Sequence, residues 1–176
     1  MTRNDPELAG NVCLALVAEG PTHGWAVAGQ LAPGSAIGRI WSLSRPLTYR
    51  ALDGLLASGA VERVGTEPGG GRTRTLLGVT AAGRRRNDEW LGSTVALPRD
   101  VRSELLLKFA LRERAAMSNV ELARAQRERF APMLATVETD AASDGDFVDR
   151  WRLEHIRAID RFLASFVAAP VPDHVA

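Results

Sequence analysis

The sequence predicts a mainly helical chain that carries a single two-stranded β-ribbon. Three observations lead to this fold class. Between residues 41 and 83, an amphipathic helical segment is followed by two β-like runs around a glycine-rich turn, and then by a new helix start. The last third of the chain places apolar residues at helical spacing. Net positive charge is concentrated in residues 39–86. Together they indicate a winged helix-turn-helix domain followed by a C-terminal helical domain.

The chain before this stretch predicts two helices, over 6–19 and 24–31. Gly20 and Pro21 end the first helix, and Thr22 or His23 opens the second. The first helix is expected to bury one stripe, made of Leu8, Val12, Cys13 and Leu16. Both helices are expected to pack behind the helix that follows.

The central helix is predicted from Ser44 to residue 57 or 58. Ser44 is a good N-cap, because a serine hydroxyl can accept a hydrogen bond from a free amide of the first turn. Pro46 falls two residues later, where its missing N–H costs nothing. Gly59 is the residue type that ends a helix in a left-handed conformation. The expected buried stripe is Thr48, Leu52, Leu55, Leu56 and Gly59.

The opposite face of this helix is slim and basic at its start. It is expected to carry Leu47, Arg50, Ala51 and Gly54, with Arg45 at the entry. A helix that enters a DNA major groove needs low bulk along its length and hydrogen-bond donors in its first turn. This face therefore suits base reading.

Two strands are expected over 60–66 and 73–79, with Val61 and Val64 alternating among polar residues in the first. The turn between them reads EPGGGR, and Arg72 and Arg74 flank its tip. The three glycines could suggest a phosphate-binding P-loop, but neither the Lys-Ser/Thr pair nor the helix of that motif follows. Thr80 is expected to cap a further helix over 81–92.

The C-terminal part predicts three more helices after a break at 92–98. The first, over 101–114, is apolar nearly all round, which implies burial between the two halves of the chain or against a partner. The second begins near Ser118, with Glu121 completing a capping box, and Pro132 should kink or break it. A loop is expected over 139–145. The last helix runs over 146–169, and two prolines end it.

The last helix carries two apolar stripes, more than one neighbouring helix could bury. The first contains Val148, Trp151, His155, Ile159, Phe162 and Phe166. The second contains Leu153, Ile156, Leu163 and Val167. One stripe is expected to pack on the chain's own helix over 101–114 and the other on a partner chain. The residues expected at the dimer interface are Trp151, His155, Ile159, Phe162 and Phe166.

Charge is distributed unevenly along the chain. The 176 residues carry a net charge of +1, but residues 39–86 hold nine arginines and three acidic residues. From Pro98 onward there are 12 basic and 13 acidic residues. A basic patch confined to the winged segment is what binding to a phosphate backbone requires. Residues 1–95 are therefore expected to form a DNA-binding domain and residues 96–176 a helical dimerisation domain.

Several function classes find no support in the sequence. His23, His155 and His174 are scattered, and neither a Gly-x-Ser-x-Gly elbow nor a CxxC pair is present, so no catalytic group, cofactor or metal is expected. Cys13 is the only cysteine, which excludes an intrachain disulfide. No apolar run approaches the roughly 20 residues that span a bilayer, and the N-terminus is polar. A cytoplasmic protein without membrane association is expected.

Four segments in this order resemble the PadR family of bacterial transcriptional regulators. They read GPTHGWAVAGQL from Gly20, SRPLTYRALDGLLASGAVE from Ser44, GRTRTLLGVTAAGR from Gly71 and RDVRSELLLKFAL from Arg99. The segment WRLEHIRAIDRFLASF from Trp151 is similar to the long C-terminal helix of some members. Family members often have Gly-Thr-Leu-Tyr where this chain has Pro46-Leu47-Thr48-Tyr49, a difference that bears on base contacts.

The resemblance implies a transcriptional regulator, most simply a repressor that binds a pseudo-palindromic operator in double-stranded DNA as a homodimer. It also suggests a small aromatic effector, for which Trp41, Trp90 and Trp151 are candidate pocket residues or, alternatively, core anchors. The alternative class is a winged-helix protein-docking or dimerisation scaffold that binds no DNA. The residues expected to contact DNA are Ser44, Arg45, Leu47, Tyr49, Arg50, Gly70, Gly71, Arg72 and Arg74.

Overall fold

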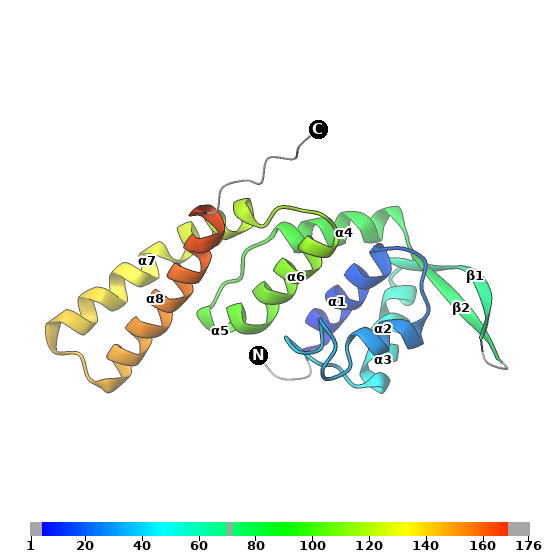
Figure 1. The fold of residues 1–176 in the computed structure, drawn as a ribbon, viewed down its shortest axis with the longest axis horizontal. Coiled ribbons are helices and arrows are strands. Elements are labelled where there is room, and N and C mark those ends of the chain that lie inside the picture. Colours follow the sequence, from blue (N-terminus) through cyan, green and yellow to red (C-terminus); the bar gives the residue numbers. More distant parts are fainter. Residues whose placement is uncertain (1–4, 70–71, 169–176) are drawn as a thin grey trace.

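The structure is a computed structural model and describes residues 5–69 and 72–168. Its elements follow in the order α1 (Pro6–Ala18), α2 (Gly24–Gln30), α3 (Arg45–Ala57), β1 (Val61–Gly69), β2 (Arg72–Val79), α4 (Ala81–Gly92), α5 (Pro98–Asp100), a π-helical turn η1 (Val101–Leu105), α6 (Leu106–Arg114), α7 (Val120–Asp144) and α8 (Phe147–Ala168). The β1–β2 wing lies at one end of the molecule and the α7–α8 hairpin at the other (Figure 1). The fold is a winged helix-turn-helix with a C-terminal helical part, as predicted.

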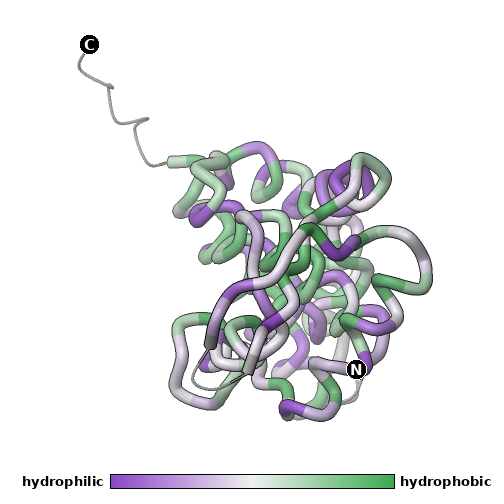
Figure 2. Tube along the Cα trace, turned by 90° about the vertical axis from the view of Figure 1, so that its right-hand side faces the viewer, coloured by the Kyte–Doolittle hydropathy of each residue, from purple (hydrophilic) through white to green (hydrophobic). Residues whose placement is uncertain are grey.

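Helix α1 is the centre of the winged part. All ten residues from Leu8 to Val17 are buried, so the predicted single stripe underestimates how deeply this helix lies. It packs against α2, α3, α4, β2 and α6. Asp5 begins it, because one carboxylate oxygen accepts hydrogen bonds from the amides of Glu7 and Leu8 at 3.0 and 3.2 Å. Figure 2, with the wing pointing toward the viewer, shows hydrophobic segments in the interior behind the paler ribbon.

The single cysteine gives a direct test of this core. The Cys13 side chain is fully buried, and burial raises its pKa from 9.0 to about 12. The unfolded thiol loses its proton at lower pH than the folded one. The stabilisation that Cys13 contributes is therefore complete below about pH 9 and is lost as the pH rises toward 12. We expect thiol reagents at pH 8 to modify Cys13 only after unfolding, and rapid labelling of the native protein would contradict the placement of α1.

The wing is longer than the sequence predicts. Its antiparallel pairing runs from Val61–Val79 to Gly69–Arg72, so the strands continue through most of the segment assigned to the turn. A β-bulge at Val64 interrupts the register and leaves that side chain exposed, so the predicted alternation of Val61 and Val64 is wrong. Thr80 caps α4 as predicted, since its hydroxyl accepts from the Gly83 amide at 3.0 Å.

Two hydrophobic cores meet at α6. Leu107 and Leu111 of α6 belong to the core built on α1, whereas Phe109 of α6 and Leu105 at the end of η1 belong to the core formed with α7 and α8. This helix is apolar nearly all round because each side faces a different core. Of the two alternatives that the sequence left open, the structure therefore shows burial between the two halves of the chain. The division of the chain at residue 95 remains a prediction.

The connector between the two parts, residues 93–97, is held by buried polar side chains. Lys108 is 0% exposed and its ammonium donates to the Ser93 carbonyl, the Ser93 hydroxyl and a Glu104 carboxylate oxygen at 2.9, 3.0 and 2.9 Å. The Gln126 amide exchanges two hydrogen bonds with the backbone of Val95. Burial lowers the pKa of Lys108 from 10.5, while the hydrogen bond to Glu104 opposes that shift.

The C-terminal hairpin departs from the prediction in three ways. Asn119, rather than Ser118, holds the N-cap position of α7, although the Ser118 hydroxyl accepts from the Val120 amide at 3.2 Å. Helix α7 continues through Pro132, which lies on the exposed side of the helix. The predicted loop over 139–145 is helical as far as Asp144. Packing along α8 holds these turns in place, which outweighs the local preference of proline and small polar residues.

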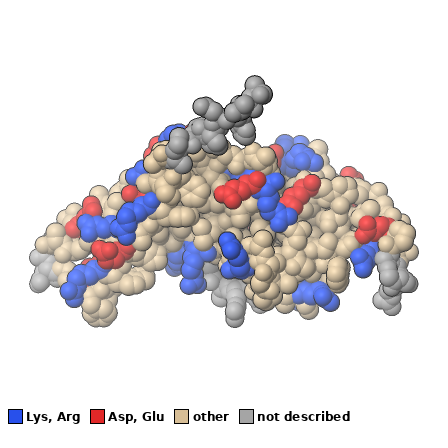
Figure 3. Space-filling model, in the orientation of Figure 1, with Lys and Arg blue, Asp and Glu red and all other residues tan. Residues whose placement is uncertain are grey.

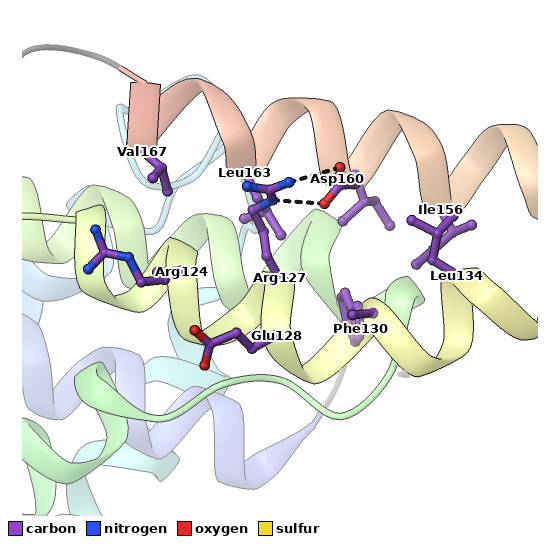
Figure 4. Close-up of a pocket in the computed structure, with 11 residues that line it drawn as sticks. Arg124, Arg127, Glu128, Phe130, Leu134, Ile156, Asp160, Leu163 and Val167 are labelled. Atoms are coloured by element: carbon purple, nitrogen blue, oxygen red, sulfur yellow. Dashed lines mark hydrogen bonds and ion pairs between the residues drawn. The ribbon is translucent and has the colours of Figure 1, made fainter.

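Ion pairs and an apolar groove lie between the two helices of the hairpin. Arg127 on α7 donates to both carboxylate oxygens of Asp160 on α8 at 2.8 and 3.3 Å (Figure 4). Arg157 and Glu138 form a second pair nearer the tip, at 3.1 Å. The groove beneath the first pair has a volume of about 420 Å³.

No helix among the described residues is long and apolar enough to cross a bilayer.

Candidate nucleic-acid interface

Helix α3 begins and ends where the sequence predicts, but its first residue acts differently. Ser44 is the N-cap and has an extended backbone, yet its hydroxyl makes no capping hydrogen bond. The Ser44 carbonyl instead accepts from both the amide and the hydroxyl of Thr48, at 2.9 and 3.1 Å. Gly59 has a φ of 69°, the left-handed conformation expected of the residue that stops the helix.

The outward face of α3 is slim, as predicted, but its members differ. Thr48, Leu52 and Leu55 are buried, as the stripe requires. Leu56, however, is only half-buried and Gly59 is exposed, because the chain leaves the core where the helix ends. Leu47 and Ala51 are only half-exposed, because they pack against the core and line a hollow of about 360 Å³ between α1 and α3. The exposed residues of the helix are Arg45, Pro46, Tyr49, Arg50, Asp53, Gly54 and Ala57. Leu47 therefore lies at the flank of this face, and the sequence analysis missed the acidic Asp53.

Tyr49 lies at the junction of α2 and α3. A methyl group added to Gly24 would come within 2.7 Å of the Tyr49 ring, so the ring lies directly over the Gly24 backbone. The Tyr49 side chain is nevertheless 42% exposed. Tyr49 therefore stands at the edge of the buried stripe, with part of its side chain open to solvent.

The cations of the winged part are largely unpaired. Within the described residues, no ion pair involves Arg39, Arg45, Arg50, Arg63, Arg84 or Arg85. Arg86 donates to the Asn11 side chain at 2.9 Å, so only two of the three arginines of its run are free. In the C-terminal part, Arg124, Arg127, Arg152 and Arg157 have carboxylate partners. The other exposed arginines there, such as Arg99, Arg150 and Arg161, form no ion pair with a described residue, so what distinguishes the winged part is its low number of acidic residues. Figure 3 shows basic side chains along the lower edge of the central part.

The wing holds the remaining predicted contacts. Gly70 and Gly71 lie outside the described residues. The Arg72 backbone pairs with Gly69 at the end of the ribbon, and its side chain is not described. Arg74 is set back from the tip, opposite Glu67, and is half-buried. Its guanidinium lies 5.2 Å from the centre of the Trp25 ring, and one of its nitrogens is 3.2 Å from His23 Nε2.

The predicted dimer residues are divided between two environments. Trp151 is 64% exposed, Phe162 is 38% exposed, and Phe147 nearby is 75% exposed. His155 is half-buried beside the Trp151 ring. Ile159 packs in the chain's own second core and leaves only 8% of its surface exposed along α8. Phe166 packs on Phe109 of α6, with ring centres 4.7 Å apart.

The assignment of the second stripe also needs correction. Ile156 and Leu163 pack in the core with α7, not primarily with the helix over 101–114, and it is Phe162 and Phe166 that reach Phe109. What remains open is a groove of about 440 Å³ along α8, which we call the α8 groove. It is lined by Val101, Leu106, Trp151, Glu154, His155, Ala158, Ile159 and Phe162.

Two of the three tryptophans considered for an effector pocket are core residues. Trp41 and Trp90 are buried, and the Trp90 indole donates to Glu104 at 3.1 Å. Only Trp151 lines a groove open to a ligand or a partner. The effector itself remains an expectation.

Comparisons with known proteins add a likeness to solved structures. No family model matched the sequence, and a search of curated proteins gave no match. Among solved structures, the chain is similar to Bacillus subtilis PadR in its crystal structure with operator DNA, at 18% sequence identity and a TM-score of 0.46. The match covers 90% of this chain and 97% of that one. A likeness at this level leaves the function of the chain to be argued from its own surface.

Proposed function

We propose that the protein is a sequence-specific DNA-binding transcriptional regulator that acts as a homodimer on a pseudo-palindromic operator, most simply as a repressor. One observation carries the proposal: arginines without acidic partners cluster on a winged helix-turn-helix, and two of them, Arg45 and Arg50, lie at the start of a slim exposed helix face. Cations left without internal partners are free to replace the counterions of a phosphate backbone.

The proposed geometry follows from the elements. Helix α3 enters the major groove with Arg45 and Arg50 toward base edges, Leu47 at its flank and Tyr49 toward the backbone. The wing follows the backbone with Arg72 near its tip. A second protomer, bound through the α8 groove, places its own α3 about one helical turn away. The acidic Asp53, on the same face of α3, disfavours close phosphate contact there and directs such contacts to the first turn.

The proposal is tested by binding the purified protein to the DNA upstream of its own gene, with a scrambled duplex of equal length as competitor. We expect preferential binding with a steep dependence on salt, and repression of a reporter joined to that DNA. A dimeric protein with no preference for any duplex would instead favour the docking-scaffold alternative.

The contribution of α3 is tested by Arg50→Ala. We expect the variant to lose specific binding by roughly 1–3 kcal/mol, because a bidentate arginine–base contact discriminates by that amount. Binding to scrambled DNA should be nearly unchanged. Arg150→Ala is the matched control, since it removes the same charge from an exposed position on α8. Equal discrimination by Arg50→Ala and the control would exclude Arg50 from base reading.

The wing tip is tested by Arg72→Ala. A phosphate contact releases counterions whatever the sequence, so the variant should weaken binding to all duplexes similarly. The slope of log affinity against log salt should fall in magnitude by about 1 for each lost contact. An unchanged slope would remove Arg72 from the interface.

A further inference from the structure

Residues 22–25, which we call the hinge turn, join the wing to the recognition helix α3. Thr22 forms a two-bond bridge with Leu77 of β2, at 3.0 and 2.7 Å. Gly24 lies under the ring of Tyr49 on α3, as described above. Helix α2, which follows this turn, lies next to α3 at the end of the molecule that carries the wing (Figure 1). The same four residues therefore contact both elements of the proposed interface.

His23 makes two hydrogen bonds that define its tautomer. Its Nδ1 accepts from the Ala26 amide at 3.0 Å and so caps α2, which requires that Nδ1 carry no proton. In the neutral ring the proton is then on Nε2, which donates to a Glu67 carboxylate oxygen at 2.9 Å. Glu67 is on β1, so this bond ties the hinge turn to the outer half of the wing. The Arg74 nitrogen 3.2 Å from Nε2 is itself a donor, so in this tautomer it contacts the ring without a hydrogen bond to Nε2.

A second contact between the hinge turn and the wing joins Trp25 and Arg74. Trp25 is 53% exposed although it is a large apolar residue, and the Arg74 guanidinium lies over its ring at 5.2 Å. Arg74 is the cross-strand partner of Glu67, so both side chains leave the wing toward the same turn. An arginine stacked on an indole keeps most of its N–H donors free while losing much of its rotational freedom.

We propose that Trp25 is a positioning residue for DNA binding, which holds Arg74 and through it the wing at a fixed angle to α3. The inference rests on the proposed function, because its consequence is measured on DNA. With Trp25 in place, Arg74 meets a phosphate already oriented, and the wing and α3 bind as one rigid surface. Without it, the wing must be ordered during binding, and affinity falls although no residue of α3 has changed.

The test compares Trp25→Ala, Trp25→Phe, Arg74→Ala and the double variant Trp25→Ala/Arg74→Ala in the full-length protein. Trp25→Ala should weaken operator binding about two- to fivefold, the change that corresponds to loss of one exposed cation–π contact. The salt slope should stay near the wild-type value, because Arg74 still reaches its phosphate once the wing is ordered, whereas Arg74→Ala should lower its magnitude by about 1. Discrimination against scrambled DNA should be retained. Trp25→Phe should recover most of the loss. Because Trp25 acts through Arg74, the double variant should bind no more weakly than Arg74→Ala alone.

A second readout needs no DNA. Amide hydrogen exchange of the wing, at Thr66, Thr73 and Thr75, should accelerate in Trp25→Ala and return toward the wild-type rate in Trp25→Phe. Additive losses in the double variant, or an unchanged wing exchange rate in Trp25→Ala, would overturn the role of Trp25. Wild-type protein that fails to bind any operator would overturn the proposed function, and the exchange measurement would still decide whether Trp25 holds the wing.

Discussion

Replacing both Trp151 and Phe162 by glutamate is expected to convert the protein from a dimer to a monomer and to abolish operator binding. Both side chains border the α8 groove. Trp151 lies largely outside the chain's own core, whereas Phe162 is 38% exposed and also contacts Phe109 of that core. Burying one large apolar side chain at an interface stabilises a complex by roughly 1.5–3 kcal/mol. Each glutamate removes that contribution and adds the cost of desolvating a charged carboxylate. In the proposed complex, the dimer interface sets the spacing of the two α3 helices, so specific binding should be lost with it.

Sedimentation of the double variant gives the oligomeric state, and circular dichroism reports whether the fold is kept. Ser165→Glu/Ala168→Glu is the matched control, because it places the same two charges at exposed positions of α8 that line none of the α8 groove. The point substitutions are sharper than removing α8 as a whole, because Ile156 and Leu163 of this helix complete the second core. A folded double variant that remains dimeric would show that the partner binds elsewhere.

The second large effect is expected from Lys108→Met, which should lower the free energy of unfolding by about 3 kcal/mol. Removing one partner of a buried ion pair typically costs 3–5 kcal/mol, and the low end applies because the Glu104 side chain keeps partial exposure. The substitution leaves the Glu104 carboxylate and the Ser93 carbonyl without the ammonium. Chemical denaturation measures the loss.

Two comparisons separate the lost pair from a general effect of charge. Arg99→Met removes one positive charge from an exposed position and should be nearly neutral. Adding Glu104→Gln to Lys108→Met should restore part of the stability, because it neutralises the stranded carboxylate.

The pH dependence of the stability has a defined sign as well. The folded pKa of Lys108 lies below 10.5, so wild-type stability rises with pH between the two values, and Lys108→Met lacks that rise. A loss below about 0.5 kcal/mol would contradict the burial of Lys108.

The elements that could be predicted from the sequence are those with local signals. Helix α3 has a proline in its first turn and a glycine after its last turn, and it begins and ends where these residues predict. Helix α4 begins directly after Thr80, its predicted cap. The glycine-rich turn predicts the wing but not the length of its strands. Backbone pairing continues through residues of the predicted turn, up to Gly69 and Arg72, because it does not depend on which side chains those residues carry. A bulge such as that at Val64 depends on the partner strand and leaves no signal in one strand.

The errors occur where a distant segment decides the local structure. Pro132 and the polar residues after 139 favour a break, yet pairing with α8 keeps α7 helical as far as Asp144. Leu47 has the spacing of an exposed residue and is half-buried only because α1 passes beside it. The contacts of Trp25 with Arg74 and of His23 with Glu67 join positions more than 40 residues apart, and spacing alone cannot show them.

The central claim is that the winged part reads DNA as one half of a dimer, and a footprint tests it most directly. The purified protein is bound to the DNA upstream of its own gene, and protection from cleavage is mapped on both strands. We predict two protected half-sites with inverted sequences, their centres about one helical turn apart, and protection that disappears with Trp151→Glu/Phe162→Glu. A single protected half-site, protection of every duplex alike, or none at any salt concentration would contradict the account.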